Sequence, residues 1–373
     1  MRIGIDIRVA CMPILKGMGV YLQNLLENLG RIDSENEYFL YYDSRLNNTL
    51  RKVSAENLKF KGIAVQGEKF HLWEQWKLPQ ALKQDKIDIF HSPANTTMAA
   101  SPCPVVVTVH DTHLQEIPRG TFFDRIYYGK VQPWNIRRAK RIITPSEYSK
   151  KNIVTFMKVP CENIAVIPLG INKNFMVPLD NNLVDTIKAK LDITGPYILN
   201  AGGESPWKNV SRLIQAFAVL VEKYRIKEKL LITGIRTKAI LDKHLCEIEN
   251  LGLKGKVHVL GYIPDDDLMG LYTGAELFVY PSLMEGFGFP PLEAMACGVP
   301  VVASNAASIP EVSGEGALYC DGKDSEDIAE KIYMVLSNKE LRQDLISKGT
   351  NWVKRYRWER TAEETLEIYK RIV

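Results

Sequence analysis

Residues 277–304 read LFVYPSLMEGFGFPPLEAMACGVPVVAS, and this stretch predicts a strand, a glycine-rich loop, a helix and a second strand. The apolar runs at its two ends are rich in β-branched and aromatic residues, as buried strands are. Between them, Pro290 and Pro291 fit the first turn of a helix, and Gly298 fits its end. Two strands joined by a helix form a parallel pair.

The same alternation of strands and helices continues along the chain. Nearly continuous apolar runs such as 105–109 predict strands that are buried on both faces. We therefore expect an α/β fold with two Rossmann-like, doubly wound and mainly parallel sheets, divided near Lys173 by the polar stretch 172–182. The predicted strands are RIGIDI, YFLYYD, IDIFHS, VVVTVH, RIITPS and IAVIPLG, followed by YILNAGG, KLLITGI, KVHVLGY, LFVYPS and VPVVAS.

Length and composition fit a globular protein with two domains. The 373 residues exceed the ~150 of a usual domain, and 46% hydrophobic with 25% charged residues argue against a disordered, collagen-like or membrane-spanning chain. Asp6 and Arg8 interrupt the first apolar stretch, which does not suit a signal peptide, so we expect a cytoplasmic protein. The six cysteines lack the spacing of a zinc site and are expected to be reduced, mostly buried thiols.

The basic residues are concentrated in the first half of the chain. Residues 1–173 contain 24 Lys and Arg against 16 Asp and Glu, whereas the remainder contains 24 against 28. Between Arg119 and Lys158, ten basic residues accompany only two acidic ones and are interspersed with aromatic residues. This segment suits an anionic surface, either nucleic acid or the anionic face of a membrane. A solvated helix face above a core of aromatic side chains would have the same composition.

Two carboxylates flank the glycine-rich loop of 277–304. Ligands of doubly wound sheets bind at the carboxyl ends of strands, and Glu285 follows such an end. The loop 286–289 offers backbone N–H groups beside a helix N-terminus, which suits a negatively charged ligand. Glu285 and Glu293 can accept hydrogen bonds from hydroxyl groups. The pattern therefore indicates a ligand that has both phosphates and a sugar; the alternative is a loop surface charge and a helix-dipole partner.

The spacing Glu285-x7-Glu293 resembles the signature of the retaining glycosyltransferases of family 4, which have the GT-B fold of two Rossmann-like domains across a cleft. The resemblance implies an acceptor-binding N-terminal domain over 1–173, a donor-binding C-terminal domain over 174–351, and a closing helix over about 352–373 that packs back on the first domain. Other segments that match this family, in the expected order, are KGMGVY, VTVHD, RIITPSEYSK, IPLGIN, GGESPWKN, GYIPDDDLMGLY and RYRWERTAEETLEIY.

The resemblance also assigns roles to the loop and its two glutamates. Glu285 would bind hydroxyl groups of the transferred sugar, and Glu293 would bind the ribose of the nucleotide. Main-chain amides would hold the sugar as well, those of Gly286, Phe287, Gly288 and Phe289.

Lys208 follows a predicted strand in the segment GGESPWKN and precedes a predicted helix. We expect it to neutralise the diphosphate leaving group, and we expect Gly203, at the same strand end, to contact the donor. Many relatives carry an arginine just before this lysine, and this chain does not. Arg212 or Arg236 is the candidate for a second cation, unless both are ordinary solvated arginines.

Further residues match family positions on both domains. His110 ends the run VVVTVH and would hydrogen-bond the donor sugar as a neutral imidazole, with Asp111 orienting it or contacting the acceptor. Gly19, in KGMGVY, would bring a backbone N–H to the phosphates. Tyr262 and Ile263 match the segment whose main chain contacts the nucleotide base.

Together these residues predict an enzyme that transfers a hexose, with mannose favoured, from a nucleotide diphospho-sugar to a glycan or polyprenyl-linked acceptor with retention of configuration. The resemblance implies neither a cofactor nor a metal, and the wording of the motifs favours GDP-mannose as the donor. The segment Arg119–Lys158 predicts a peripheral position at the inner face of a membrane, and we expect no nucleic-acid partner.

Three alternatives share features with this prediction. A nucleotide-sugar epimerase or a phosphorylase of the same fold would bind similar ligands. An NAD-dependent dehydrogenase would also have Rossmann-like sheets, but Gly17 and Gly19 lack the third glycine of that fingerprint, because Leu22 stands there. A nucleic-acid-binding module would use the basic segment, and its affinity would fall steeply with salt.

Overall fold

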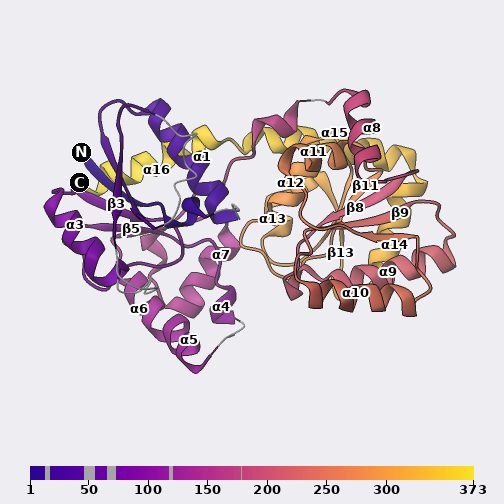
Figure 1. The fold of residues 1–373 in the computed structure, drawn as a ribbon, viewed down its shortest axis with the longest axis horizontal. Helices are drawn as coiled ribbons and strands as arrows, with labels where there is room; N and C mark the ends of the chain where they lie inside the picture. Colours follow the sequence, from indigo (N-terminus) through magenta and orange to yellow (C-terminus); the bar gives the residue numbers. More distant parts are fainter. Residues whose placement is uncertain (13–16, 46–54, 65–72, 117–120, 178) are drawn as a thin grey trace. The chain divides into compact units, whose positions relative to one another are not determined.

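The computed structural model describes residues 1–12, 17–45, 55–64, 73–116, 121–177 and 179–373. The chain forms two compact units (Figure 1): the N-terminal unit, Met1–Gly170 with Tyr356–Val373, and the C-terminal unit, Ile171–Arg355. The first division lies close to the predicted boundary at Lys173. The second lies a little beyond Trp352, where the closing helix was expected to begin.

The N-terminal unit contains a parallel sheet with the strand order β3-β2-β1-β4-β5-β6-β7. Its strands are β1 (Arg2–Asp6), β2 (Glu37–Asp43), β3 (Leu58–Ile63), β4 (Ile89–Ser92), β5 (Val105–Thr108), β6 (Arg141–Thr144) and β7 (Ile164–Val166). Its helices are α1 (Gly17–Ile32), α3 (Leu78–Gln84), α4 (His113–Glu116), α5 (Phe122–Ile126), α6 (Gln132–Arg137), α7 (Glu147–Asn152) and α16 (Trp358–Ile372). Single 3-10 or π turns are η1 (Arg8–Cys11), η2 (Trp73–Lys77), η3 (Tyr127–Val131), η4 (Ile153–Met157) and η5 (Cys161–Asn163).

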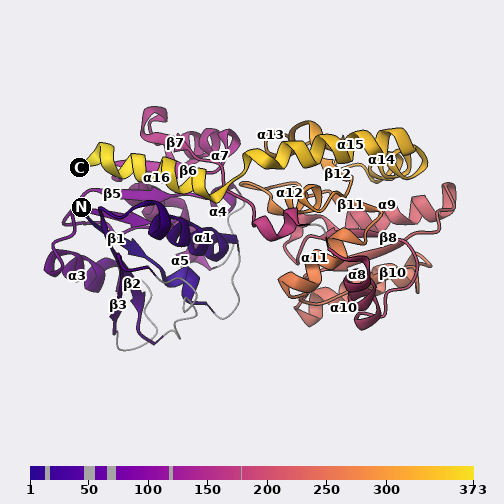
Figure 2. The same cartoon turned by 90° about the horizontal axis from the view of Figure 1, so that it is seen from above.

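Both faces of this sheet are covered by helices, as the continuous apolar strands predict. Phe90 and Val107 pack with α3 and α6 in one core. The next residues along these strands, His91 and Thr108, point to the opposite face, because side chains alternate along a strand. There Thr108 bonds to Tyr21 of α1, and α1 packs against α16 (Figure 2).

The C-terminal unit contains a second parallel sheet, with the order β10-β9-β8-β11-β12-β13. Its strands are β8 (Tyr197–Ala201), β9 (Lys229–Thr233), β10 (Val257–Val259), β11 (Leu277–Tyr280), β12 (Val301–Ser304) and β13 (Ala317–Cys320). Its helices are α8 (Asn181–Lys190), α9 (Val210–Lys223), α10 (Lys238–Asn250), α11 (Asp265–Thr273), α12 (Phe289–Ala296), α13 (Ile309–Ser313), α14 (Ser325–Ser337) and α15 (Lys339–Trp352). Short 3-10 turns are η6 (Lys173–Met176), η7 (Pro206–Lys208), η8 (Gly314–Gly316) and η9 (Val353–Arg355). In Figure 1, α9, α10 and α14 lie on one side of this sheet, and α11, α12 and α15 lie on the other.

The predicted α/β fold of two doubly wound parallel sheets is confirmed in both units. Two edge strands, β3 and β13, were not predicted. β3 reads LKFKGI, in which lysines interrupt the apolar run, because only part of an edge strand is covered. β13 reads ALYC, which has none of the β-branched residues that mark most of the predicted strands.

Because all strands in each sheet are parallel, their carboxyl ends lie along one edge. His110 and Asp111 follow β5 at that edge of the N-terminal sheet. Gly203 follows β8, and Glu285 follows β11 at the corresponding edge of the C-terminal sheet. The predicted site residues thus lie where doubly wound sheets bind ligands.

The helix that closes the N-terminal unit is α16, and it begins at Trp358 rather than Trp352. The side chain of Trp352 instead belongs to the C-terminal unit, where its indole N–H donates to the carbonyl of Val312 at 2.7 Å. The buried face of α16 includes Thr361, whose hydroxyl donates to Pro168 O at 2.8 Å, and Tyr369, which bonds to His91 at 2.5 Å.

No helix within the described part of the chain is long and apolar enough to cross a membrane. All six cysteines are free thiols, as predicted, but only Cys11 and Cys320 are buried, so the prediction of mostly buried thiols was wrong. Burial raises the pKa of Cys11 to about 11 and that of Cys320 to about 12, so both are protonated thiols at neutral pH.

Candidate functional site

Glu285 and Lys208 form an ion pair at the carboxyl edge of the C-terminal sheet. Lys208 Nζ lies 2.7 Å from Glu285 Oε1, and the two side chains are 19% and 10% exposed. The same oxygen accepts hydrogen bonds from the hydroxyls of Tyr280 at 2.8 Å and Ser282 at 2.6 Å. Lys208 Nζ also donates to the Tyr280 hydroxyl at 2.6 Å. This cluster therefore fixes an acid and a base side by side at a strand end.

Hydrogen bonds between loops hold this pair in place. The loop after β8 and the loop after β11 are joined by Trp207 O, which accepts from Leu283 N at 2.8 Å and from Ser282 Oγ at 3.1 Å. Asn209, in the left-handed conformation with φ +64°, donates to Pro281 O at 3.0 Å and caps this junction. The main chain on both sides of Lys208 is therefore fixed next to the loop that contains Glu285.

The glycine-rich loop turns sharply into α12, as predicted. Gly288 has φ +98°, a conformation that favours glycine, and immediately precedes Phe289, the first residue of the helix. Ser308 donates to the carbonyls of Glu285 and Phe287, both at 3.0 Å, and so fixes the start of the loop. Gly298 ends the helix with φ +73°.

Glu293 lies inside α12 and lines a cavity of about 200 Å³. Its Oε2 accepts a hydrogen bond from Tyr272 at 2.9 Å. Burial raises the pKa of Glu293 to about 7, the charge of Asp265 acts in the same direction, and Tyr272 and Lys208 oppose it. Glu293 is therefore partly protonated near neutral pH.

This cavity brings together several of the predicted donor-binding residues. Gly203, with φ +77°, lies at its wall with Glu293, Tyr262 and Ile263. Gly203 packs closely against Gly234, which follows the neighbouring strand β9, because a Cβ added to Gly234 would lie 3.0 Å from Gly203 Cα. These four residues come from three separate sequence motifs, each of which was predicted to bind the donor. All four line this one cavity.

The two arginines proposed for a second cation differ in their surroundings. Arg236 stacks over the ring of Tyr262, 4.6 Å from its centroid, and so lies beside the cavity. Arg212 Nη1 makes a long contact of 3.4 Å with Gln215 on its own helix. Arg212 is not among the residues that line the cavity.

His110 lies at the carboxyl edge of the N-terminal sheet, where it is buried. Its Nε2 lies 2.9 Å from the carbonyl of Pro93, so Nε2 carries the proton and donates. Burial lowers the pKa of His110, against the opposing effects of the Pro93 bond and of Asp111. Neutral imidazole therefore has its lone pair on Nδ1. The ring of Tyr21 contacts it edge-on at 4.8 Å.

Asp111 and Gly19 belong to the same unit. Asp111 lines a separate cavity of about 440 Å³ together with Asn95, Tyr127 and Tyr128. Its Oδ1 accepts from the backbone N–H of His113 at 3.2 Å. Gly19 is buried within α1. Lys16, in the same KGMGVY segment, lies outside the described residues.

Several residues of the site were not predicted. Tyr280 and Ser282 contact Glu285, and Tyr272 contacts Glu293. Tyr280 is the last residue of β11, and Ser282 follows two positions later, so both side chains point to the same side of the extended chain. A search for polar residues at this spacing after a strand could have found them. Asn95, whose side chain accepts from His110 N at 2.6 Å, follows no motif.

His91, which was not predicted to be a site residue, has a structural role. It is fully buried between Thr108 at 2.7 Å and Tyr369 at 2.5 Å, and burial lowers its pKa to about 3. Within the described residues, no group of three or more His, Cys, Asp or Glu side chains has an arrangement that could hold a metal ion.

Two family models match the chain, one on each unit. The model described as "Glycosyltransferase Family 4" matches residues 15–175, and that described as "Glycosyl transferases group 1" matches residues 184–352. Among solved structures, Anabaena Alr3699/HepE in complex with UDP-glucose has a TM-score of 0.79, with 17% identity over 99% of each chain. The likeness of these structures concerns the fold.

Curated relatives extend the match to the sequence. O-antigen chain mannosyltransferase B of Escherichia coli is 32% identical over 305 residues, 81% of this chain and 79% of that protein. Serotype-specific mannosyltransferase WbdA of Escherichia coli is 27% identical over 254 residues, which are 67% of this chain but only 31% of that longer protein. On these matches, the chain is a glycosyltransferase and belongs to family 4, with the GT-B fold.

Proposed function

We propose that this glycosyltransferase moves a hexose, with mannose favoured, from a nucleotide diphospho-sugar to a hydroxyl of a glycan or lipid-linked acceptor, with retention of configuration. The observation that carries the proposal is the pair Lys208–Glu285, 2.7 Å apart at a strand end. Glu293 lies close enough to this pair for the charge of Lys208 to lower the pKa of its carboxyl group. A cation, a sugar-binding carboxylate and a ribose-binding carboxylate are the groups that a nucleotide sugar requires.

Lys208 would act on the leaving group. Cleavage of the bond between sugar and phosphate builds negative charge on the departing nucleotide, and a fixed ammonium stabilises that charge more than it stabilises the bound donor. Glu285, held by Tyr280 and Ser282, would then accept hydrogen bonds from the sugar hydroxyls. The departing phosphate would take the proton of the acceptor hydroxyl on the same face of the sugar. The step needs no metal, so full activity is expected in excess EDTA.

His110 would contact the donor sugar. Its Nε2–H is already donated to Pro93, and its lowered pKa keeps the ring neutral, so Nδ1 is the atom that can accept from a sugar hydroxyl. A neutral ring adds no positive charge beside the developing oxocarbenium ion. These two properties suit a hydrogen-bonding role rather than proton transfer.

The acceptor would bind in the cavity of about 440 Å³ that contains Asp111. Tyr127 and Tyr128 line it, and aromatic faces are favourable surfaces for sugar rings. The segment 121–158 next to it exposes Phe122 (71%) and Trp134 (46%) among basic residues, as a peripheral membrane surface would. Preferential partitioning with anionic over neutral liposomes is expected, and equal partitioning would count against membrane contact.

The donor is proposed to be GDP-mannose, because several relatives are named as mannosyltransferases. Thermal unfolding with GDP, UDP, dTDP, CMP and NAD tests this, since a ligand of the native state raises the unfolding temperature. GDP alone is expected to do so, and GDP-mannose is then expected to support transfer to a mannosylated acceptor. A rise in the unfolding temperature with UDP alone would mean that the donor is a UDP-sugar. No rise with any of these ligands would contradict the proposed function.

A further inference from the structure

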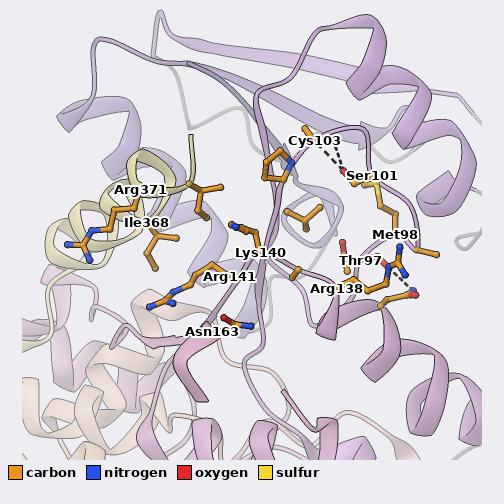
Figure 3. Close-up of a pocket in the computed structure, with 16 residues that line it drawn as sticks. Thr97, Met98, Ser101, Cys103, Arg138, Lys140, Arg141, Asn163, Ile368 and Arg371 are labelled. Atoms are coloured by element: carbon orange, nitrogen blue, oxygen red, sulfur yellow. Dashed lines mark hydrogen bonds between the residues drawn. The ribbon is translucent and has the colours of Figure 1, made fainter. Parts of the chain in front are cut away.

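A second cavity, of about 940 Å³, lies in the N-terminal unit, and three of its basic residues belong to the segment Arg119–Lys158. It is lined at the amino ends of β5 and β6, where Val105 and Arg141 begin these strands. The last turn of α16 contributes Arg371. Figure 3 shows Arg371 on the α16 side and Thr97 on the opposite side, with Arg141 between them. The volume is in the upper range for small-molecule sites.

This cavity is separate from the acceptor side of the active site. His110 follows the carboxyl end of β5, whereas the cavity begins at its amino end. The four residues of β5 separate these edges by about 13 Å, at ~3.3 Å per residue. A ligand of the cavity is therefore not the reacting sugar.

Four cationic side chains line the cavity, and no carboxylate does. Arg138, Lys140, Arg141 and Arg371 form no ion pair with any described residue. Arg141 donates to the carbonyl of Glu162, and Arg138 stacks over Trp134 with 4.7 Å to the ring centroid. The guanidinium groups of Arg138 and Arg141 are thus held in place by these contacts. None of the four positive charges is paired with a carboxylate of the described chain. Such a cluster favours a phosphoryl group.

Two residues that line the same cavity each have a buried polar atom with no partner in the described chain. Thr97 is 2% exposed and Asn135 is 1% exposed, and neither Thr97 Oγ1 nor Asn135 Oδ1 has a hydrogen-bond partner. The amide nitrogen of Asn135 is used, since it donates to Thr97 O at 3.0 Å. Unpaired buried polar atoms are costly unless a ligand or water pairs with them. A hydroxyl and an amide oxygen suit the hydroxyl groups of a polyol.

We propose that this cavity is a second ligand site of the protein and binds a phosphorylated carbohydrate. The basic residues hold the phosphoryl group, and Thr97 with Asn135 pairs with hydroxyl groups of the sugar. The inference is independent of the proposed donor and acceptor, because none of their residues lines this cavity. The ligand is either free in solution or the headgroup of a lipid, and both present the same chemistry.

The test is calorimetric titration of the full chain with mannose 1-phosphate in excess GDP, which keeps the donor site occupied. One site is expected, with an affinity that falls at least tenfold in the double variant Lys140→Glu, Arg371→Glu. Lys370→Glu is the control for the change on α16, since it reverses one charge next to Arg371 at a position outside the cavity and is expected to leave binding unchanged. Binding is also expected to persist in Lys208→Ala, which separates this site from the donor site. Equal affinity in the double variant would overturn the proposal.

Thr97→Val tests the polyol contact. Removing an unpaired hydroxyl is expected to leave the unfolding temperature of the free protein unchanged or higher, while mannose 1-phosphate binds several-fold more weakly. If inorganic phosphate binds as tightly as mannose 1-phosphate, the claim that the cavity recognises a sugar is overturned. Phosphatidylinositol vesicles that displace mannose 1-phosphate in the calorimetric titration support a lipid headgroup as the ligand. Phosphatidylserine vesicles that displace it equally well would overturn the lipid headgroup.

Discussion

Lys208 contacts a carboxylate in the free protein, although its proposed partner in the reaction is a phosphate. The ammonium, Tyr280 and Ser282 all donate to one oxygen of Glu285, so the carboxylate is held without depending on the lysine alone. Lys208→Ala is therefore expected to leave the loop folded and to lower kcat by two decades or more, about 3 kcal/mol. Steady-state kinetics measures this. Lys254→Ala, an exposed lysine of the same unit (87%), is the control, and undiminished turnover in Lys208→Ala would remove Lys208 from the mechanism.

Glu285→Ala separates sugar contact from nucleotide contact. Its carboxylate is proposed to bind the sugar, whereas Glu293 is proposed to bind the ribose, so transfer is expected to be lost while GDP affinity is largely kept. Glu293→Ala is the complementary variant, in which GDP affinity itself falls. Titration calorimetry with GDP distinguishes the two. Equal losses of GDP affinity in both variants would contradict the assigned roles.

The half-buried carboxyl of Glu293 links stability to pH. Its pKa is raised to about 7 in the folded chain from a usual 4.5, so its stabilising contribution is complete below about pH 4.5 and is lost as the pH rises through about 7. Glu293→Gln stays neutral and avoids this loss. In urea unfolding, the free energy of unfolding of the variant is expected to exceed that of the original protein by an amount that grows between pH 4.5 and pH 8, up to about 3 kcal/mol. A pH-independent difference would show that the carboxyl titrates normally.

At the scale of elements, the helix α12 depends on glycines at both ends. Gly288 has φ +98° before it and Gly298 has φ +73° after it, and both have space for a methyl group. Either change to Ala is expected to cost about 1 kcal/mol through backbone strain. Only Gly288→Ala is expected to raise the KM for the donor, because it moves the loop that follows Glu285. Equal KM values in the two variants would mean that the loop does not contact the donor.

Strands buried on both faces were predictable, because a run such as 105–109 is almost continuously apolar. The helix start at Pro290 and Pro291 was also predictable, since proline fits only the first turn. Asp265 and its two neighbours occupy the first turn of α11, where acidic side chains are favourable because they face the positive end of the helix dipole.

The candidate site was predictable where one motif contained it. Glu285 and Glu293 are eight residues apart, and their spacing identified them. Their partners were not predictable, because Tyr272 reaches Glu293 from a different helix. Thr97 and Asn135 were missed for the same reason: only the folded chain brings the amino ends of the strands and α16 around one cavity.

At the scale of the whole molecule, the last helix completes the first unit. Gly170 permits this, because a Cβ at that position would lie 2.2 Å from the backbone nitrogen of Trp358. Gly170→Ala must therefore displace the start of α16, and the expected cost to the N-terminal unit is about 2 kcal/mol or more. Gly17→Ala is the control in the same unit, since a Cβ there meets nothing within 4 Å.

Hydrogen exchange measured by mass spectrometry is the appropriate readout, because it reports each unit separately. Gly170→Ala is expected to speed exchange in α1 and α16, which pack together, and to leave the strands β8 to β12 unchanged. GDP-induced protection is expected to survive, since the proposed nucleotide contacts lie in the C-terminal unit alone. Faster exchange in both units would mean that the two unfold as one, and the C-terminal helix would then stabilise the entire chain.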